Sequence, residues 1–80
     1  MRVLISERFT RSFKEAPEKI QKNFGKQLAH LLKDLRYPSL KSKKYDESRN
    51  IWQARVDGDW RFYFTIDGDM YCLIDIISHP

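Results

Sequence analysis

The feature that most constrains the fold is a pair of Asp-Gly-Asp triplets near the C-terminal end, at positions 57–59 and 67–69. The triplets separate three runs rich in β-branched and aromatic residues, Ile51–Val56, Trp60–Ile66 and Met70–Ile77. An Asp-Gly pair between such runs is a strong local signal for a β-hairpin. The sequence therefore predicts three antiparallel strands joined by two hairpins.

The first half of the chain predicts a short strand followed by two helices. Arg2–Ser6 is apolar and β-branched, and Ser6 can cap a helix over Glu7–Glu15 because its hydroxyl accepts from an unpaired N–H of the first turn. Pro17 interrupts this helix and suits the first turn of another one, which Pro38 then ends. Apolar residues recur at helical spacing in the second helix, namely Ile20, Phe24, Leu28, Leu31, Leu32 and Leu35.

These elements predict an α+β fold in which two N-terminal helices pack on one face of an antiparallel sheet of about four strands. The segment Tyr37–Asn50 is polar and basic, and we expect it to form a loop. Eighty residues make a single domain, residues 1–80. The lone Cys72 excludes an internal disulfide and a cysteine-rich zinc site. Neither a membrane-spanning run nor a secretory signal is recognisable, so we expect a cytoplasmic protein with no membrane partner.

The alternation of side chains along a strand predicts which residues share a face of the sheet. If three-residue loops join the strands, the apolar residues point into one core, Arg55 pairs with Arg61, and Gln53 pairs with Tyr63. The same loop length in the second hairpin places Asp75 beside Arg61. The face away from the helices then carries a polar set, which comprises Arg55, Arg61, Tyr63 and Asp75, with His79 in the same phase just beyond the last strand.

The second hairpin also predicts exposed apolar side chains. With a three-residue loop, Tyr71, Leu73 and Ile77 lie on the polar side of the sheet, whereas Cys72 points into the core. An apolar patch of this kind favours binding of a partner helix or strand. The alternative is that the chain's own loop around Leu40 and Tyr45 covers it.

Positive charge is concentrated in the part of the chain before Phe62. All 15 lysines and arginines lie at or before Arg61, three acids follow it, and the net charge is +4. A basic chain favours a polyanionic partner, either nucleic acid or an acidic protein segment. Arg55 opposite Arg61 needs a compensating charge, for which Asp75 is the expected source. Two interpretations stay open, an ordinary solvated ladder with one ion pair and a cradle for phosphate oxygens.

The order of the elements and the stretch from SLKSKKYDESRNIW through QARV to DWRFYF resemble the RelE/ParE superfamily of bacterial toxins. The family pattern Y/W-x-x-R-V … D-Y/W-R-x-x-Y is matched by Trp52, Arg55, Val56, Asp59, Trp60, Arg61 and Phe64. The terminal run YCLIDIISHP also resembles the family's last strand. The resemblance covers nearly the whole chain and implies a single toxin domain of a type II toxin–antitoxin pair.

Two activities are implied by this resemblance. RelE-like members cut mRNA in the ribosomal A site, whereas ParE-like members poison DNA gyrase and are not nucleases. In either case the resemblance implies a cognate antitoxin as partner, with mRNA and the ribosome, or alternatively gyrase, as target in a bacterial or archaeal cytoplasm. A basic binding module without catalytic activity is the third alternative.

Cleavage of RNA through its 2′-hydroxyl needs a base, an acid and cations, and requires no metal or cofactor. Arg61 matches the family's core arginine, Arg55 is the next candidate cation, and His79 is suited to proton transfer near neutral pH. The candidate RNA-binding residues are Lys41, Lys43, Lys44 and Tyr63. One departure from the family counts against nuclease activity, because no arginine or lysine follows Arg61.

Overall fold

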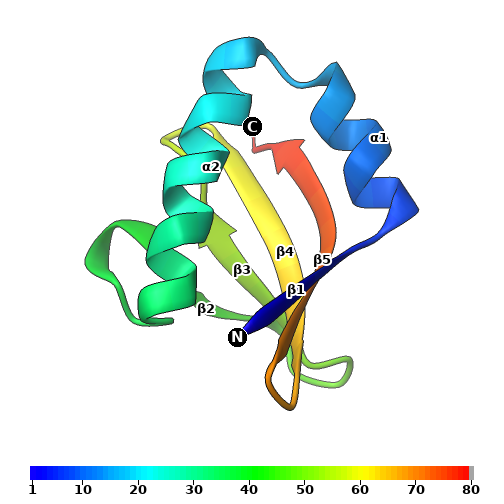
Figure 1. The fold of residues 1–80 in the computed structure, drawn as a ribbon, viewed down its shortest axis with the longest axis vertical. Helices are drawn as coiled ribbons and strands as arrows, with labels where there is room; N and C mark the ends of the chain where they lie inside the picture. Colours follow the sequence, from blue (N-terminus) through cyan, green and yellow to red (C-terminus); the bar gives the residue numbers. More distant parts are fainter. Residues whose placement is uncertain (80) are drawn as a thin grey trace.

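The computed structural model describes residues 1–79. In chain order its elements are β1 (Arg2–Ile5), α1 (Glu7–Glu15), α2 (Glu18–Lys33), the short 3-10 helix η1 (Pro38–Leu40), β2 (Lys43–Asp46), β3 (Ile51–Arg55), β4 (Trp60–Asp67) and β5 (Met70–Ser78). The strands form one five-stranded sheet in the order β1-β5-β4-β3-β2 (Figure 1). The predicted α+β architecture is confirmed, although the sheet is mixed, because β1 runs parallel to β5.

The additional strand, β2, comes from the segment that the sequence predicted as a loop. Lys43 pairs with Gln53 and Lys44 with Trp52 at the edge of the sheet. Edge strands are commonly short and rich in charged residues, particularly lysine, because these features discourage pairing with another chain. The polar composition that suggested a loop is therefore compatible with an edge strand.

The two helices begin where the sequence predicts. The Phe9 N–H donates to Ser6 Oγ at 3.0 Å, so Ser6 caps α1, and the same hydroxyl donates to the Ile74 carbonyl of β5 at 3.0 Å. The predicted end of the second helix at Pro38 is wrong, because the helix already ends at Lys33 and Asp34 is extended. Within residues 1–79, neither helix has the combination of length and apolar composition needed to cross a bilayer.

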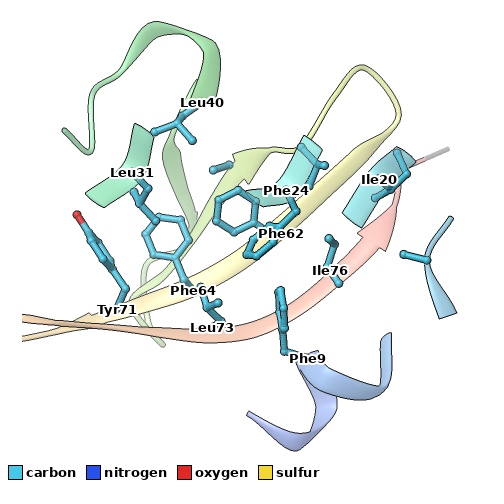
Figure 2. Close-up of a cluster of buried hydrophobic side chains, with 13 residues drawn as sticks. Phe9, Ile20, Phe24, Leu31, Leu40, Phe62, Phe64, Tyr71, Leu73 and Ile76 are labelled. Atoms are coloured by element: carbon cyan, nitrogen blue, oxygen red, sulfur yellow. The ribbon is translucent and has the colours of Figure 1, made fainter. Parts of the chain in front are cut away.

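The core lies between the two helices and one face of the sheet (Figures 1 and 2). The ring of Phe24 in α2 lies 5.1 Å from that of Phe62 in β4, nearly perpendicular to it, and 5.1 Å from that of Phe9 in α1. Phe62 and Phe64 are completely buried. Because side chains alternate along a strand, Arg61 and Tyr63 of β4 must face away from the helices.

The predicted register between β3 and β4 is confirmed. Arg55 pairs with Arg61 and Gln53 pairs with Tyr63. The hairpin closes through the Val56 N–H, which donates to the Trp60 carbonyl at 2.9 Å, and leaves a three-residue loop.

The predicted register between β4 and β5 is wrong at the turn. Asp67 pairs with Met70, so the loop has two residues, and Gly68 adopts a positive φ of 60° that glycine tolerates without strain. The shorter loop turns Tyr71 and Leu73 into the core, where the sequence had predicted them to be exposed. Cys72 correspondingly lies on the other side of β5, opposite Thr65, rather than in the core.

A β-bulge then reverses the phase of β5. Phe64 pairs with Leu73, but the preceding residue Tyr63 pairs with Asp75, so one extra residue, Ile74, is inserted. Beyond the bulge, Asp75 returns to the polar side, where the sequence had predicted it. It lies opposite Tyr63 and not opposite Arg61, which pairs with Ile77. Ile77 is exposed as expected.

Replacing Phe62 with alanine tests the position of the core. We expect Phe62→Ala to lower the free energy of unfolding by about 3–5 kcal/mol, because it leaves a cavity beneath α2. Lys19→Ala, at an exposed position of the same helix, is the control and should change it by no more than about 0.5 kcal/mol. Urea-induced unfolding measures both, and equal effects of the two variants would contradict this core.

Candidate functional site

The sheet surface that faces away from the helices carries four buried polar residues, which we call the polar face. They are Gln53 in β3, Arg61 and Tyr63 in β4, and Asp75 in β5. Cross-strand pairing places Gln53 beside Tyr63 and Tyr63 beside Asp75, and each residue is at most 9% exposed. Charged residues are seldom buried to this degree unless they have a partner, so the bonds of Arg61 and Asp75 decide what this surface can do.

Arg61 is bound to the turn between β3 and β4. Its Nη1 donates to the carbonyl oxygens of Asp57 at 2.8 Å, Gly58 at 3.2 Å and Trp60 at 3.0 Å. These carbonyls offset the like charge of Arg55 across the ladder, a role that the sequence analysis had given to Asp75. Arg61 therefore organises the hairpin from within and exposes little of its guanidinium.

Asp75 pairs with an arginine from α1 instead. Arg8 Nε lies 3.0 Å from Asp75 Oδ2, while Asp75 Oδ1 accepts from the Ile76 N–H at 2.9 Å. The pairing of β1 with β5 stops at Leu73, so α1 can reach the polar face around the uncovered end of β5. The Arg8 side chain is 70% exposed and retains surface for an anion.

Tyr63 packs against a second tyrosine. Its ring lies 4.9 Å from that of Tyr45 in β2 at an angle of 67°. Burial is the main cause that raises the pKa of the Tyr63 phenol. The neighbouring Tyr45 raises the pKa further, Arg61 lowers it, and Asp75 raises it again. The phenol is therefore protonated at neutral pH and can donate a hydrogen bond to a phosphate oxygen.

A pocket of about 220 Å³ opens beside these residues. Its polar lining comes from Arg8, Arg49, Tyr45, Tyr63 and Asp75, and its apolar lining from Ile51, Ile74 and Ile77. Arg49 is held by Asp46, with Nε and Oδ2 2.8 Å apart, and is 76% exposed. Exposed guanidinium groups next to aromatic rings are suited to phosphates and stacked bases.

The three lysines predicted as one RNA-binding group are separated in space. Lys43 pairs with Gln53 and lies on the polar side of β2. Lys44 points to the opposite side, with its Nζ 5.1 Å from the centre of the Trp52 ring and 3.8 Å from Glu47. Lys41 follows η1 and lines a different pocket, between α2 and the β3–β4 turn.

His79 is brought to the same turn as Arg61. Its backbone N–H donates to the Asp59 carbonyl, and the preceding residue Ser78 pairs with Trp60. His79 is exposed. The predicted catalytic residues Arg55, Arg61 and His79 thus all lie at the end of the sheet that carries the β3–β4 turn.

Three residues of the polar-face pocket were missed by the sequence analysis: Arg8, Tyr45 and Arg49. Arg8 could not be found from a motif, because a helix and a bulge bring it to Asp75 across 67 positions of the chain. Tyr45 had a weak signal, since Lys43 and Tyr45 alternate with Lys44 and Asp46 as in a strand.

Comparison with known proteins finds solved toxin structures with a similar fold. No family model matches the sequence, and no curated protein matches it either. A YoeB/ParE toxin from Agrobacterium tumefaciens superposes with a TM-score of 0.81 at 10% identity, over 100% of both chains. In a YoeB-YefM toxin-antitoxin complex from Staphylococcus aureus, the matching chain gives 0.79 at 14% identity, over 100% of this chain and 98% of that one. The RelE-RelB complex from Pyrococcus horikoshii gives 0.78 at 15% identity, with coverages of 96% and 92%.

This chain has the RelE/ParE toxin fold. Sequence identities of 10–15% establish a shared fold and do not by themselves assign an activity. Within residues 1–79 of this RelE/ParE-like fold, no group of three or more His, Cys, Asp and Glu side chains is arranged to hold a metal ion.

The bonds of Arg61 to the turn predict a structural cost for its removal. We expect Arg61→Met to lower the free energy of unfolding by about 2 kcal/mol, because hydrogen bonds from a charged donor are lost and the carbonyls remain. Arg55→Met removes the same charge from the facing position, with no side-chain bond lost within residues 1–79, and serves as the matched control. Urea unfolding compares the two variants, and an Arg61→Met cost no larger than that of Arg55→Met would exclude the bound guanidinium.

The tyrosines predict a loss of stability in alkali. Burial raises the pKa of both Tyr63 and Tyr71 above 10.0, so between pH 10 and the folded pKa only the unfolded chain releases these protons. The contribution of these two tyrosines to the free energy of unfolding is therefore complete below pH 10, and it is lost as the pH rises through the pKa of the folded state. Tyr63→Phe should flatten the alkaline decline in unfolding free energy, with Tyr37→Phe, a tyrosine outside the polar face, as control. An unchanged alkaline slope in Tyr63→Phe would contradict the assignment.

Proposed function

We propose that this chain, as one domain over residues 1–80, is the toxin of a type II toxin–antitoxin pair and cuts mRNA on the ribosome as RelE-like toxins do. The observation that carries the proposal is the polar face. In a fold shared with YoeB, RelE and YafQ toxins, it combines paired Arg55 and Arg61, a protonated Tyr63, and a pocket with exposed arginines.

The proposed reaction needs only acid–base and electrostatic catalysis. The 2′-oxygen of one nucleotide loses its proton to a base and bonds to the adjacent phosphorus. The bond from phosphorus to the 5′-oxygen of the next nucleotide then breaks, and an acid protonates that oxygen. The products are a 2′,3′-cyclic phosphate and a 5′-hydroxyl. Cations and hydrogen-bond donors stabilise the charge that develops on the phosphorane.

The residues can be given roles according to their exposure. Arg55 is partly exposed and provides the cation at the phosphate. Buried Arg61 positions the β3–β4 turn, which follows Arg55 closely and accepts from the backbone N–H of His79. His79 transfers a proton, because the two nitrogens of an imidazole ring can donate or accept one. The Tyr63 hydroxyl donates a hydrogen bond to a phosphate oxygen. Lys43 lies on the same side of the sheet and attracts the negatively charged RNA.

Inhibition of DNA gyrase, as by ParE-like toxins, is the second candidate function. The observations in its favour are that Arg61 is 8% exposed and donates to three carbonyls, and that no lysine or arginine follows it. A protein that inhibits gyrase by binding needs no catalytic residues, so a buried Arg61 is compatible with that function.

We also propose a cognate antitoxin as partner, in the cytoplasm of a bacterium or archaeon. Solved relatives of this fold are complexes with the antitoxins YefM and RelB. Exposed apolar side chains are available for such contacts, namely Leu4 and Ile5 on β1 and Ile77 on β5. The expected patch of Tyr71, Leu73 and Ile77 is replaced by this set, because Tyr71 and Leu73 are buried.

Cleavage by purified protein on ribosomes programmed with a defined mRNA tests the proposal. We expect a new 5′-hydroxyl end within the A-site codon, and a rate about 10²- to 10³-fold lower for Arg55→Gln, which removes one donor to the developing charge. His79→Gln should also slow the reaction and change its pH profile. Lys14→Gln on α1 removes one exposed positive charge elsewhere and should leave the rate unchanged.

The same preparation distinguishes the alternatives. If mRNA stays intact and supercoiling by gyrase is inhibited, the protein is a gyrase-directed toxin and not an endonuclease. Intact mRNA and unaffected gyrase would indicate a basic binding module without catalytic activity. Unfolding curves of each variant separate loss of function from loss of fold.

A further inference from the structure

A second basic pocket lies between α2, the end of η1 and the β3–β4 turn. Its volume is about 430 Å³, and its cationic and polar lining includes Lys26, His30, Lys41, Arg55, Gln27 and Ser39. It is separate from the polar-face pocket, with which it shares no lining residue. Arg55 nevertheless connects it to the polar face, because it is the cross-strand partner of Arg61.

Gln27 lines this pocket, is 8% exposed, and connects the elements around it through hydrogen bonds. Its Nε2 donates to the Ser39 carbonyl at 3.1 Å and to the Arg55 carbonyl at 2.8 Å, and its Oε1 accepts from Ser39 Oγ at 2.9 Å. These bonds fix α2, η1 and β3 relative to one another. A pocket that is already formed needs little reordering when a ligand binds.

The cations around the pocket have no carboxylate partner. Among the salt bridges of the described part of the chain, none involves Lys26, Lys41 or Arg55. The acid at the rim, Asp57, is engaged elsewhere, because its Oδ1 accepts from the backbone N–H groups of Asp59 and Trp60. The pocket therefore carries a net positive charge that favours an anion.

Lys41 is held at the pocket in a strained conformation. Its φ of 46° and ψ of 46° are left-handed, a region that costs a residue other than glycine on the order of 1 kcal/mol. Glycine or asparagine would fit this position with less strain. The lysine at this position nevertheless adds a positive charge to the lining of the pocket.

The surroundings favour a nucleic-acid phosphate over an acidic peptide. Val56, the only apolar residue that lines the pocket within residues 1–79, is 4% exposed, so an apolar anchor has nowhere to bind. A stripe of lysines runs along the outer side of α2, consisting of Lys19, Lys22, Lys26 and Lys33. Next to it, the His30 ring stacks on Tyr37 at 3.8 Å. Basic grooves beside aromatic rings bind single strands through phosphates and bases.

We propose that this pocket binds a backbone phosphate of the RNA strand whose cleavage is assigned to the polar face. The RNA strand passes the β3–β4 turn on its way from the polar face to this pocket, and Arg55 contacts the RNA between the two. The inference rests on RNA being the substrate, but binding here does not require cleavage, so the two can be tested separately.

The test uses the ¹⁵N-labelled full chain and a single-stranded RNA of about ten nucleotides with 2′-O-methyl groups, which cannot be cleaved through the 2′-oxygen. We expect amide shifts at Lys41, Arg55 and Gly58 on titration. Lys26→Gln combined with Lys41→Gln should weaken binding about tenfold and reduce the slope of log K against log salt by about 1.4, since each single-strand phosphate contact contributes about 0.7.

The matched control is Arg11→Gln combined with Lys14→Gln, which removes the same charge from exposed positions of α1. Equal weakening by both double variants, or no shift at the pocket amides, would overturn the inference even if ribosomal cleavage is observed. Tighter binding of a poly-glutamate peptide of equal charge at these amides would overturn it as well. RNA bound at these amides without cleavage on ribosomes would support the pocket and contradict the endonuclease.

Discussion

The position of β4 in the middle of the sheet is the constraint on which the remaining structure depends. Phe62 and Phe64 are fully buried beneath the helices, so Arg61 and Tyr63 must point the other way. A slip of one residue would exchange the two sets and place a guanidinium in the aromatic core. The core packing that stabilises the domain therefore also determines which side of the sheet can carry chemistry.

The bulge in β5 completes the polar face. Leu73 and Ile76 both contribute to the core although they are three residues apart, which regular alternation does not allow. The inserted residue, Ile74, resolves the conflict and returns Asp75 to the side of Tyr63. The Ile74 carbonyl also accepts from the cap of α1, so the bulge, the start of α1 and the Arg8–Asp75 ion pair form one connected arrangement. Bulges that redirect side chains in this way are common beside functional sites.

Local signals were sufficient for part of this description. The Ser6 cap, the apolar stripe of α2 and the Arg55–Arg61 pair follow from spacing and alternation within short segments. The remainder depends on tertiary contacts. Whether Gly68 closes a loop of two or three residues is decided by how Tyr71 and Leu73 pack, and the edge strand β2 is defined by its partner β3. The pairing of Arg55 with Arg61 was therefore predictable from the sequence. Arg8, Tyr45 and Arg49 were not, because they reach the pocket from α1, β2 and the segment after β2.

We propose that the polar face acts on RNA, within a fold shared with toxins that were crystallised with their antitoxins. The most direct test is to induce the gene in a bacterium and map transcript 5′ ends genome-wide during growth arrest. An endonuclease that acts on the ribosome should produce new ends inside translated codons, and these ends should disappear when translation is blocked beforehand. Growth arrest with intact transcripts and an induced DNA-damage response would contradict this proposal.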